Sequence, residues 1–95
     1  MPRDAKDEKT VFVGSRPTMN YVTAALFIAN TSDTVSIKAR GRAISRACDV
    51  AEILRNRFLK DMQYTTVEIS TEEITQSETN RTSNVSAIEI VMSKK

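Results

Sequence analysis

Apolar residues in the first third of the chain change from a strand-like to a helix-like spacing. Thr10-Val11-Phe12-Val13 is a short β-rich run, and Pro17 suits the first turn of a helix. Apolar residues then recur at i, i+4 and i+7 on one helical face, at Val22, Leu26 and Ala29. The pattern predicts a strand over 10–13 and a helix over 17–30. The lone aromatics Tyr21 and Phe27 are expected in the core or in an interface.

The middle of the chain repeats this order. Val35-Ser36-Ile37 alternates as a strand does, and a second helix is predicted from Ala43 to Leu59. The apolar stripe of that helix consists of Ile44, Ala47, Cys48, Ala51, Leu54 and Phe58. Val50 and Ile53 make it wider than one sheet covers, so we expect part of it to contact another subunit. Cys48, on the stripe without a neighbouring base, is expected to be a buried small hydrophobic residue.

The last third predicts two strands that are joined by a polar arm. Residues 65–70 and 85–92 alternate between apolar and polar positions, whereas 71–84 contain no aromatic residue and one large aliphatic residue, Ile74. We therefore predict that 71–84 form an extended, exposed hairpin with its tip near Thr79-Asn80.

The predicted order is β-α-β-α-β-β, an α+β two-layer sandwich of two helices and a four-stranded mixed sheet with an extended hairpin arm. We predict a flexible, charged tail over 1–9 and a single domain over 10–95. Right-handed crossovers make the first three strands parallel, so the turns that follow them emerge at one edge of the sheet. That edge is expected to gather Arg16, the basic segment 38–46 and the hairpin that carries Arg81.

Charge is distributed unevenly along the chain. Residues 38–60 hold seven cations and two acids, although the net charge of the whole chain is only +2. Of the ten acids outside this segment, six lie in residues 61–95. The four cations of the segment 38–46 are Lys38, Arg40, Arg42 and Arg46. Small residues separate the first three, Gly41 lets a ligand approach the backbone, and a helix amino terminus follows. The segment predicts a phosphate-binding surface, and a solvated basic loop is the alternative.

Several classes of function are disfavoured by the sequence. The longest uncharged run is too short and too polar to span a membrane, no signal peptide is recognisable, and a single cysteine fits a reducing compartment, so we expect a cytoplasmic protein. The chain has no histidine. Glu72 and Glu73 would point to opposite faces of a strand, which is unsuitable for an acid/base pair or a shared metal. We expect no catalytic site, no metal and no cofactor.

Four segments together resemble the Alba family of DNA- and RNA-binding proteins of archaeal chromatin. They are Pro17-Thr18-Met19-Asn20-Tyr21-Val22, Ile37-Lys38-Ala39-Arg40-Gly41-Arg42-Ala43-Ile44-Ser45, Arg55-Asn56-Arg57-Phe58-Leu59 and Val85-Ser86-Ala87-Ile88-Glu89-Ile90. The resemblance implies a nucleoid-associated homodimer whose basic edges and hairpin arms embrace and condense double-stranded DNA with little regard for sequence, and which also binds RNA. It implies that Phe58 joins neighbouring dimers, and that the contacts to nucleic acid include Arg16, Lys38, Arg40, Gly41, Arg42, Arg46 and Arg81.

The chain departs from the family at two places. The family typically has two lysines between the glycine and the proline of the first loop, whereas this chain has Ser15 and Arg16, so lysine acetylation there is in doubt. The arm is acidic, with Glu72, Glu73 and Glu78 around Arg81, and carboxylates oppose entry into a minor groove.

Three questions stay open at the level of sequence. Arg46 either contacts phosphate or pairs with Asp49 at i+3. The same fold also suits an RNA-binding protein in RNA processing or translation, because an edge that reads the backbone tolerates DNA and RNA alike. A protein-interaction module that uses the wide face of the second helix, without binding nucleic acid, is the remaining alternative.

Overall fold

The computed structural model describes residues 9–95 except residues 77 and 79. Its helices and strands are β1 (Thr10–Phe12), α2 (Thr18–Thr31), β2 (Thr34–Arg40), α3 (Ile44–Ile53), β3 (Met62–Gln76) and β4 (Arg81–Lys94). A 3-10 turn, Gly41–Ala43, precedes α3, and a π-helical segment, Leu54–Phe58, extends it. The predicted order β-α-β-α-β-β is confirmed.

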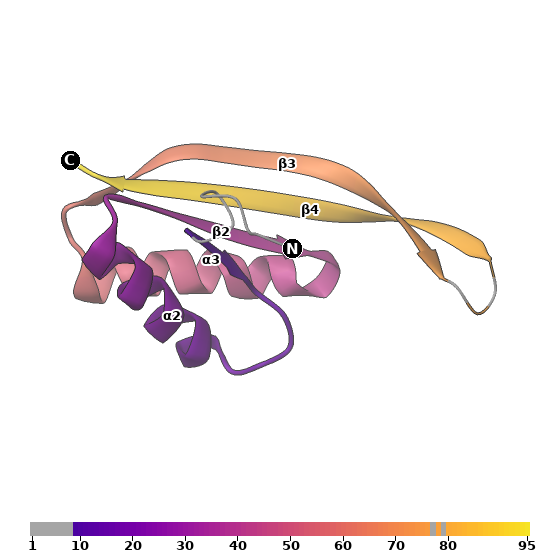
Figure 1. The fold of residues 1–95 in the computed structure, drawn as a ribbon, viewed down its shortest axis with the longest axis horizontal. Helices are drawn as coiled ribbons and strands as arrows, with labels where there is room; N and C mark the ends of the chain where they lie inside the picture. Colours follow the sequence, from indigo (N-terminus) through magenta and orange to yellow (C-terminus); the bar gives the residue numbers. More distant parts are fainter. Residues whose placement is uncertain (1–8, 77, 79) are drawn as a thin grey trace.

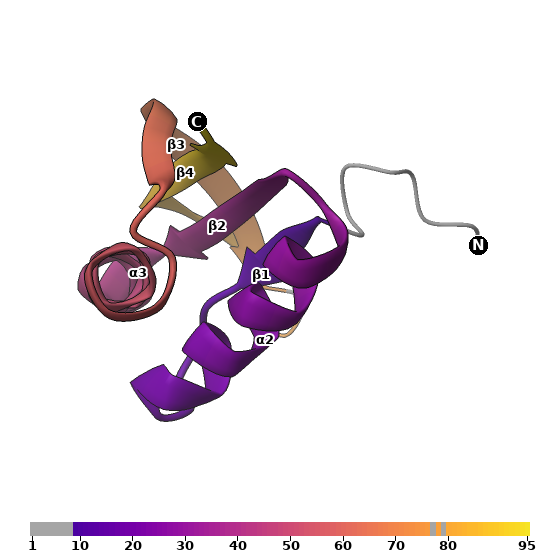
Figure 2. The same ribbon diagram turned by 90° about the vertical axis from the view of Figure 1, so that its left-hand side faces the viewer.

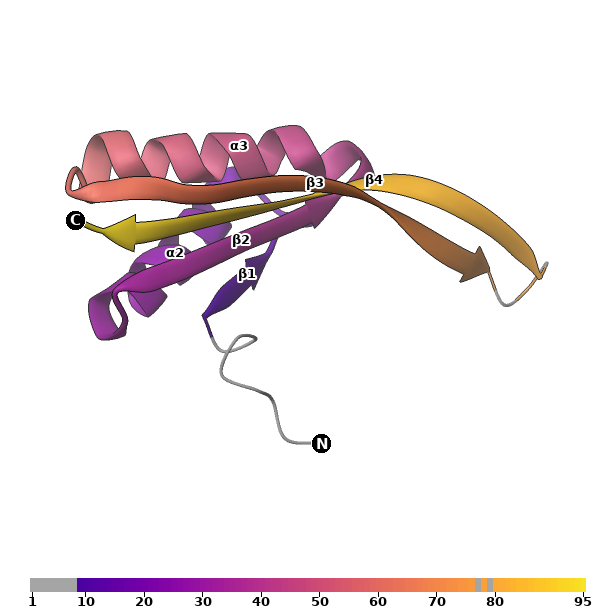
Figure 3. The ribbon, with the colours of Figure 1, turned by 90° about the horizontal axis from the view of Figure 1, so that it is seen from above.

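The sheet has the order β1-β2-β4-β3. β1 and β2 are parallel, and β4 is antiparallel to both of its neighbours, so β1, β2 and β3 all run in the same direction, as predicted. Figures 1 and 2 show both helices on one face of this sheet. Within residues 9–95 apart from 77 and 79, the other face carries no helix, which makes the fold a two-layer sandwich with one open face (Figure 3).

The core forms where small helical residues meet branched strand residues. Ala25 and Ala29 of α2, and Ala47 and Ala51 of α3, are almost fully buried. Their small side chains let both helices approach the sheet closely. The sheet contributes buried aliphatic and sulfur-containing side chains, among them Val11, Val35, Ile37, Ile90 and Met92. Burial of this apolar surface is the main stabilising contribution to the fold.

The strands are longer than their apolar patterns predicted. The strand expected over 35–37 extends to Arg40, because Lys38 and Arg40 pair in register with Glu89 and Ala87 of β4. The strand expected over 65–70 continues to Gln76, and the strand expected over 85–92 already begins at Arg81. The antiparallel pairing of the two strands thus continues beyond the body of the protein as the predicted arm. Backbone pairing does not depend on side-chain hydrophobicity, so the polar arm remains a β-hairpin.

The predicted tail and the predicted tip of the arm are described only in part. Residues 1–8, which make up nearly all of the expected tail, and Thr79 of the expected tip lie outside the described residues. The carbonyl oxygen of Lys9 accepts a hydrogen bond of 2.8 Å from the amide of Ser36, next to β1. Asn80 has a φ of 54°, in the left-handed region that asparagine tolerates in turns.

Candidate nucleic-acid interface

The turns that follow β1 and β2 lie at the same end of the sheet, and the arm extends from that end (Figures 1 and 3). Arg16 is exposed in the loop between β1 and α2, and Arg42 is exposed in the 3-10 turn after β2. Arg81 begins β4 on the arm, where it is exposed and faces Gln76 in the register. The predicted convergence of these segments is therefore present in the fold.

Lys38 and Arg40 lie two residues apart on β2 and so share the open face of the sheet. The sequence placed them in a turn, but the structure places them in a strand, which holds their backbones in a defined register. Arg40 is exposed, whereas Lys38 is half-buried. A strand presents both cations on one surface without the cost of ordering a flexible loop.

Gly41 lies where β2 ends and the 3-10 turn before α3 begins. Its φ is +60°, a conformation in which an L side chain is strained, and no atom of the described residues beyond its two chain neighbours lies within 4 Å of the place where a Cβ would be. In the part of the chain that the structure describes, nothing fills the space beside the Gly41 backbone, and its contact with a ligand stays a prediction. Among the described residues, no side chain caps the amino terminus of α3, and the first turn of α3 contains no acid that would offset the positive end of its dipole.

Arg46 and Tyr21 fix the loop after β1. The Arg46 guanidinium donates a hydrogen bond of 2.6 Å to the carbonyl oxygen of Gly14. The Tyr21 hydroxyl accepts hydrogen bonds from the amides of Gly14 and Arg16, at 2.9 and 3.0 Å. Among the described residues, Arg46 therefore bonds to the Gly14 carbonyl and not to Asp49, and its contact with phosphate stays a prediction. Tyr21, which was expected to serve only packing, positions the loop that carries Arg16.

Both cations on β2 already have carboxylate partners. Arg40 Nη1 lies 3.0 Å from Glu72 Oε1, and Lys38 Nζ lies 4.0 Å from Glu89 Oε2. The side chains of Arg40 and Glu72 are 60% and 49% exposed, and a pair of this kind contributes about 0–1 kcal/mol. A phosphate can therefore displace Glu72 at small cost. Glu72, which we expected to oppose nucleic acid from the arm, instead pairs with Arg40, a predicted phosphate contact.

We predict that Glu72→Gln tightens nucleic-acid binding about two- to five-fold at low salt, because it frees the Arg40 guanidinium without changing the size of residue 72. The gain should shrink as salt screens the pair. Glu73→Gln is the matched control, since it removes the same charge from the opposite face of the strand. Equal gains from the two variants, measured by fluorescence anisotropy on one duplex, would contradict a specific role for Glu72.

A second surface, between α3 and β3, is apolar. Val67 and Ile69 of β3 are 55% and 81% exposed, and Cys48 lines the adjacent cleft with Tyr64 and Val67. The prediction that Cys48 is buried is wrong for the single chain: it is exposed, because β3 leaves this part of α3 uncovered. Phe58, at the end of the π-helical segment, is 47% exposed.

Tyr64 connects β3 to α3 beside this apolar surface. Its hydroxyl donates a short hydrogen bond to Glu52, and its ring lies under the guanidinium of Arg55, 5.6 Å from ring centroid to Cζ. Partial burial and the bond to Glu52 raise the pKa of Tyr64 to about 12, and the same bond lowers the pKa of Glu52. Tyr64 is therefore neutral and Glu52 ionised at neutral pH, which keeps the donor and the acceptor in place.

Two residues of the open face were not predicted from the sequence to belong to the site. Phe12 alternates with the buried residues Val11 and Val13, so its side chain points to the open face, where it is 61% exposed. Glu89 lies directly opposite Lys38. The alternation around Phe12 could have predicted that its side chain lies on the open face. The position of Glu89 opposite Lys38 depends on the strand order, because β4 lies next to β2.

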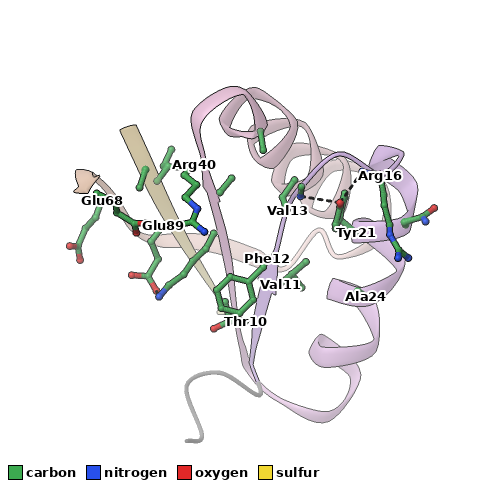
Figure 4. Close-up of a pocket in the computed structure, with 18 of the residues that line it drawn as sticks. Thr10, Val11, Phe12, Val13, Arg16, Tyr21, Ala24, Arg40, Glu68 and Glu89 are labelled. Carbon is green, nitrogen blue, oxygen red and sulfur yellow. Dashed lines mark hydrogen bonds and ion pairs between the residues drawn. The ribbon is translucent and has the colours of Figure 1, made fainter. Parts of the chain in front are cut away.

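A groove joins the open face to the loop after β1 (Figure 4). Phe12, Lys38 and Arg40 line it on the face of the sheet, and Arg16 and Asn20 line it beyond β1.

In the part of the chain that the structure describes, no cluster of three or more potential metal ligands occurs. None of the described helices has the length and hydropathy of a membrane span.

Comparison with known proteins identifies one family. Residues 9–71 match the family Alba. The chain is 58% identical to DNA/RNA-binding protein Alba 1 of Archaeoglobus fulgidus, over 93% of this chain and 98% of that protein. It is 49% identical to DNA/RNA-binding protein Alba of Methanocella arvoryzae, over 93% and 92%. The solved structure of Alba from Thermoplasma volcanium superimposes with a TM-score of 0.82 at 44% identity, covering 90% of this chain and 99% of that one.

Proposed function

The chain belongs to the Alba family, and from this premise we propose that it binds double-stranded DNA with little sequence preference, coats and compacts it as a dimer, and also binds RNA. The relatives described above are named DNA/RNA-binding proteins and not enzymes. The proposed location is the nucleoid of the cytoplasm.

One observation carries the proposal: exposed Arg40 and Arg42 flank a glycine with open space beside it, at the uncapped amino terminus of α3. Such a site attracts phosphate through charge, backbone amides and the helix dipole together. It offers no side chain that must match a particular base edge. Contacts to the phosphate backbone position a protein on nucleic acid without reading its sequence.

The exposed surface formed by Val67, Ile69 and the neighbouring part of α3 supports the proposed dimer. A strand residue as apolar as Ile69 that is 81% exposed leaves a large hydrophobic side chain in water. Covering this patch with the same patch of a second copy would remove both from water by a two-fold arrangement. A dimer also doubles the number of cations that face one duplex.

The salt dependence of binding tests the proposal. With Lys38, Arg40, Arg42 and Arg46 as the upper limit for each subunit, a dimer neutralises on the order of eight phosphates, which predicts a log–log slope no steeper than about −7. Because Arg46 also holds the Gly14 carbonyl, the slope should be shallower than this limit. A slope near zero on random duplex would overturn the phosphate contacts.

Phe58 is proposed to join dimers along the nucleic acid. We predict that Phe58→Ala leaves the dimer and the melting temperature nearly unchanged, because the ring is 47% exposed, and reduces the cooperativity of coating. Titration of a long duplex measures this, with Phe27→Ala, which removes a more exposed ring from α2, as control. Unchanged cooperativity, or a large fall in melting temperature, would indicate a role within one subunit instead.

A further inference from the structure

Phe12 lies on the open face of the sheet beside Lys38 and Arg40, but the duplex contacts proposed above do not involve its ring. Its neighbours Val11 and Val13 are 5% and 7% exposed on the helix side, whereas the Phe12 ring is 61% exposed on the other side. It therefore contributes little to the core. A large apolar ring held in water by a rigid strand is a ready surface for a planar ligand.

The residues around Phe12 form a row across the sheet. In register, Phe12 lies beside Lys38, Lys38 beside Glu89, and Glu89 beside Glu68. Lys38 Nζ lies 6.0 Å from the centroid of the Phe12 ring. The ring thus has a cation on one side, and the two carboxylates lie further across the face.

The groove around β1 continues from this row toward further cations. In the view of Figure 4, Phe12 lies between Arg40 and Arg16 along this groove. Lys38 and Asn20 also line it. β1 is the edge strand of the sheet, so no further strand of the described residues covers this path. A sugar-phosphate backbone that followed the groove would meet cations before and after the ring, and Glu68 and Glu89 would keep it on the β1 side.

We propose that Phe12 is a stacking platform for an unpaired base of single-stranded nucleic acid, whose flanking phosphates lie against Lys38, Arg40 and Arg16. The proposal rests on the nucleic-acid binding proposed above and adds a second form of ligand to it. In a duplex the faces of the bases are covered by their neighbours, so a ring on a flat sheet cannot reach them. A single strand exposes these faces, and stacking on an aromatic side chain does not depend on base identity.

Tryptophan fluorescence tests the stack directly, because the chain has no tryptophan. Phe12→Trp places a single indole on the platform, and Phe27→Trp places one on an exposed surface of α2 as control. A mixed-sequence single-stranded RNA of about 12 nucleotides should quench the indole at position 12 and leave that at position 27 unchanged. Duplex of the same sequence should quench neither. An indole at position 12 that saturating single strand does not quench would overturn the proposal.

Affinity gives a second readout. Phe12→Ala should weaken single-strand binding about 5- to 100-fold, Phe12→Tyr should retain it, and Phe27→Ala should not change it. Because stacking releases no counterions, Phe12→Ala should leave the salt slope of single-strand binding unchanged, whereas Lys38→Ala should reduce it. Phe12→Leu keeps an apolar residue on β1 and should bind as weakly as Phe12→Ala, which separates loss of stacking from loss of fold.

The two proposals fail in distinguishable ways. If the parent protein binds the single strand and Phe12→Ala binds it equally well, the stacking platform is wrong and the proposed function stands. If the parent binds neither duplex nor single strand, the proposed function is wrong, and the platform falls with it.

Discussion

Replacing both Arg40 and Arg42 by Ala is expected to weaken binding to random duplex at least about 100-fold at 0.1 M salt. The double variant removes two of the four basic-segment cations of each subunit, so the salt slope should fall to about half of its parental value. The loss should be similar on duplexes of different sequence, because phosphate contacts carry no base information.

The fold should survive this double substitution. Both side chains are exposed, and the ion pair of Arg40 with Glu72 is of the surface kind that contributes about 0–1 kcal/mol. Lys60→Ala combined with Lys95→Ala is the matched control, because it removes the same charge from exposed positions near the other end of the sheet (Figure 1). Duplex affinity of the Arg40/Arg42 variant equal to that of the control would show that the basic turn is not the phosphate site.

Introducing charge into the apolar surface of β3 is expected to convert the proposed dimer into a monomer. Val67→Asp with Ile69→Asp places two carboxylates in the proposed interface, where each subunit would bury them without partners. Analytical ultracentrifugation measures the mass. Duplex affinity should fall when dimerisation is lost. The salt slope should halve, since one subunit presents about four cations and a dimer about eight.

The same variant tests whether β3 is an interface or a solvated edge. Thr75→Asp with Ser83→Asp adds equal charge to exposed positions on the arm and should leave the dimer intact. If the Val67/Ile69 variant remains a dimer, the subunits meet elsewhere. If it is monomeric but binds duplex with the parental salt slope, the second subunit does not contribute its cations.

Much of the architecture was predictable because its signals are local. The change in apolar spacing at Pro17 and the polar stretch 71–84 each report on a few neighbouring residues. From the resulting order, the handedness of crossovers was sufficient to bring the turns after β1 and β2 to the end of the sheet from which the arm extends. The extents of the strands were less predictable, since backbone pairing continues through residues whose side chains carry no apolar pattern.

The partners of the site residues were not predictable from the sequence. Arg40 and Glu72 are 32 residues apart, as are Arg46 and Gly14, and no local pattern links either pair. Likewise, Cys48 lies on an apolar stripe, but its exposure depends on how far β3 covers α3.

The sequence by itself thus determined the element order, the polar arm and the basic segment at the start of α3, because spacing and turn chemistry act over one or two turns of chain. Only the tertiary structure decided which charges meet. The insertion of β4 between β2 and β3 sets Glu89 against Lys38 and brings Glu72 within 3.0 Å of Arg40. Strand order is a property of the whole sheet, in which residues distant along the chain become neighbours, and it places carboxylates beside the cations that the sequence alone left free for phosphate.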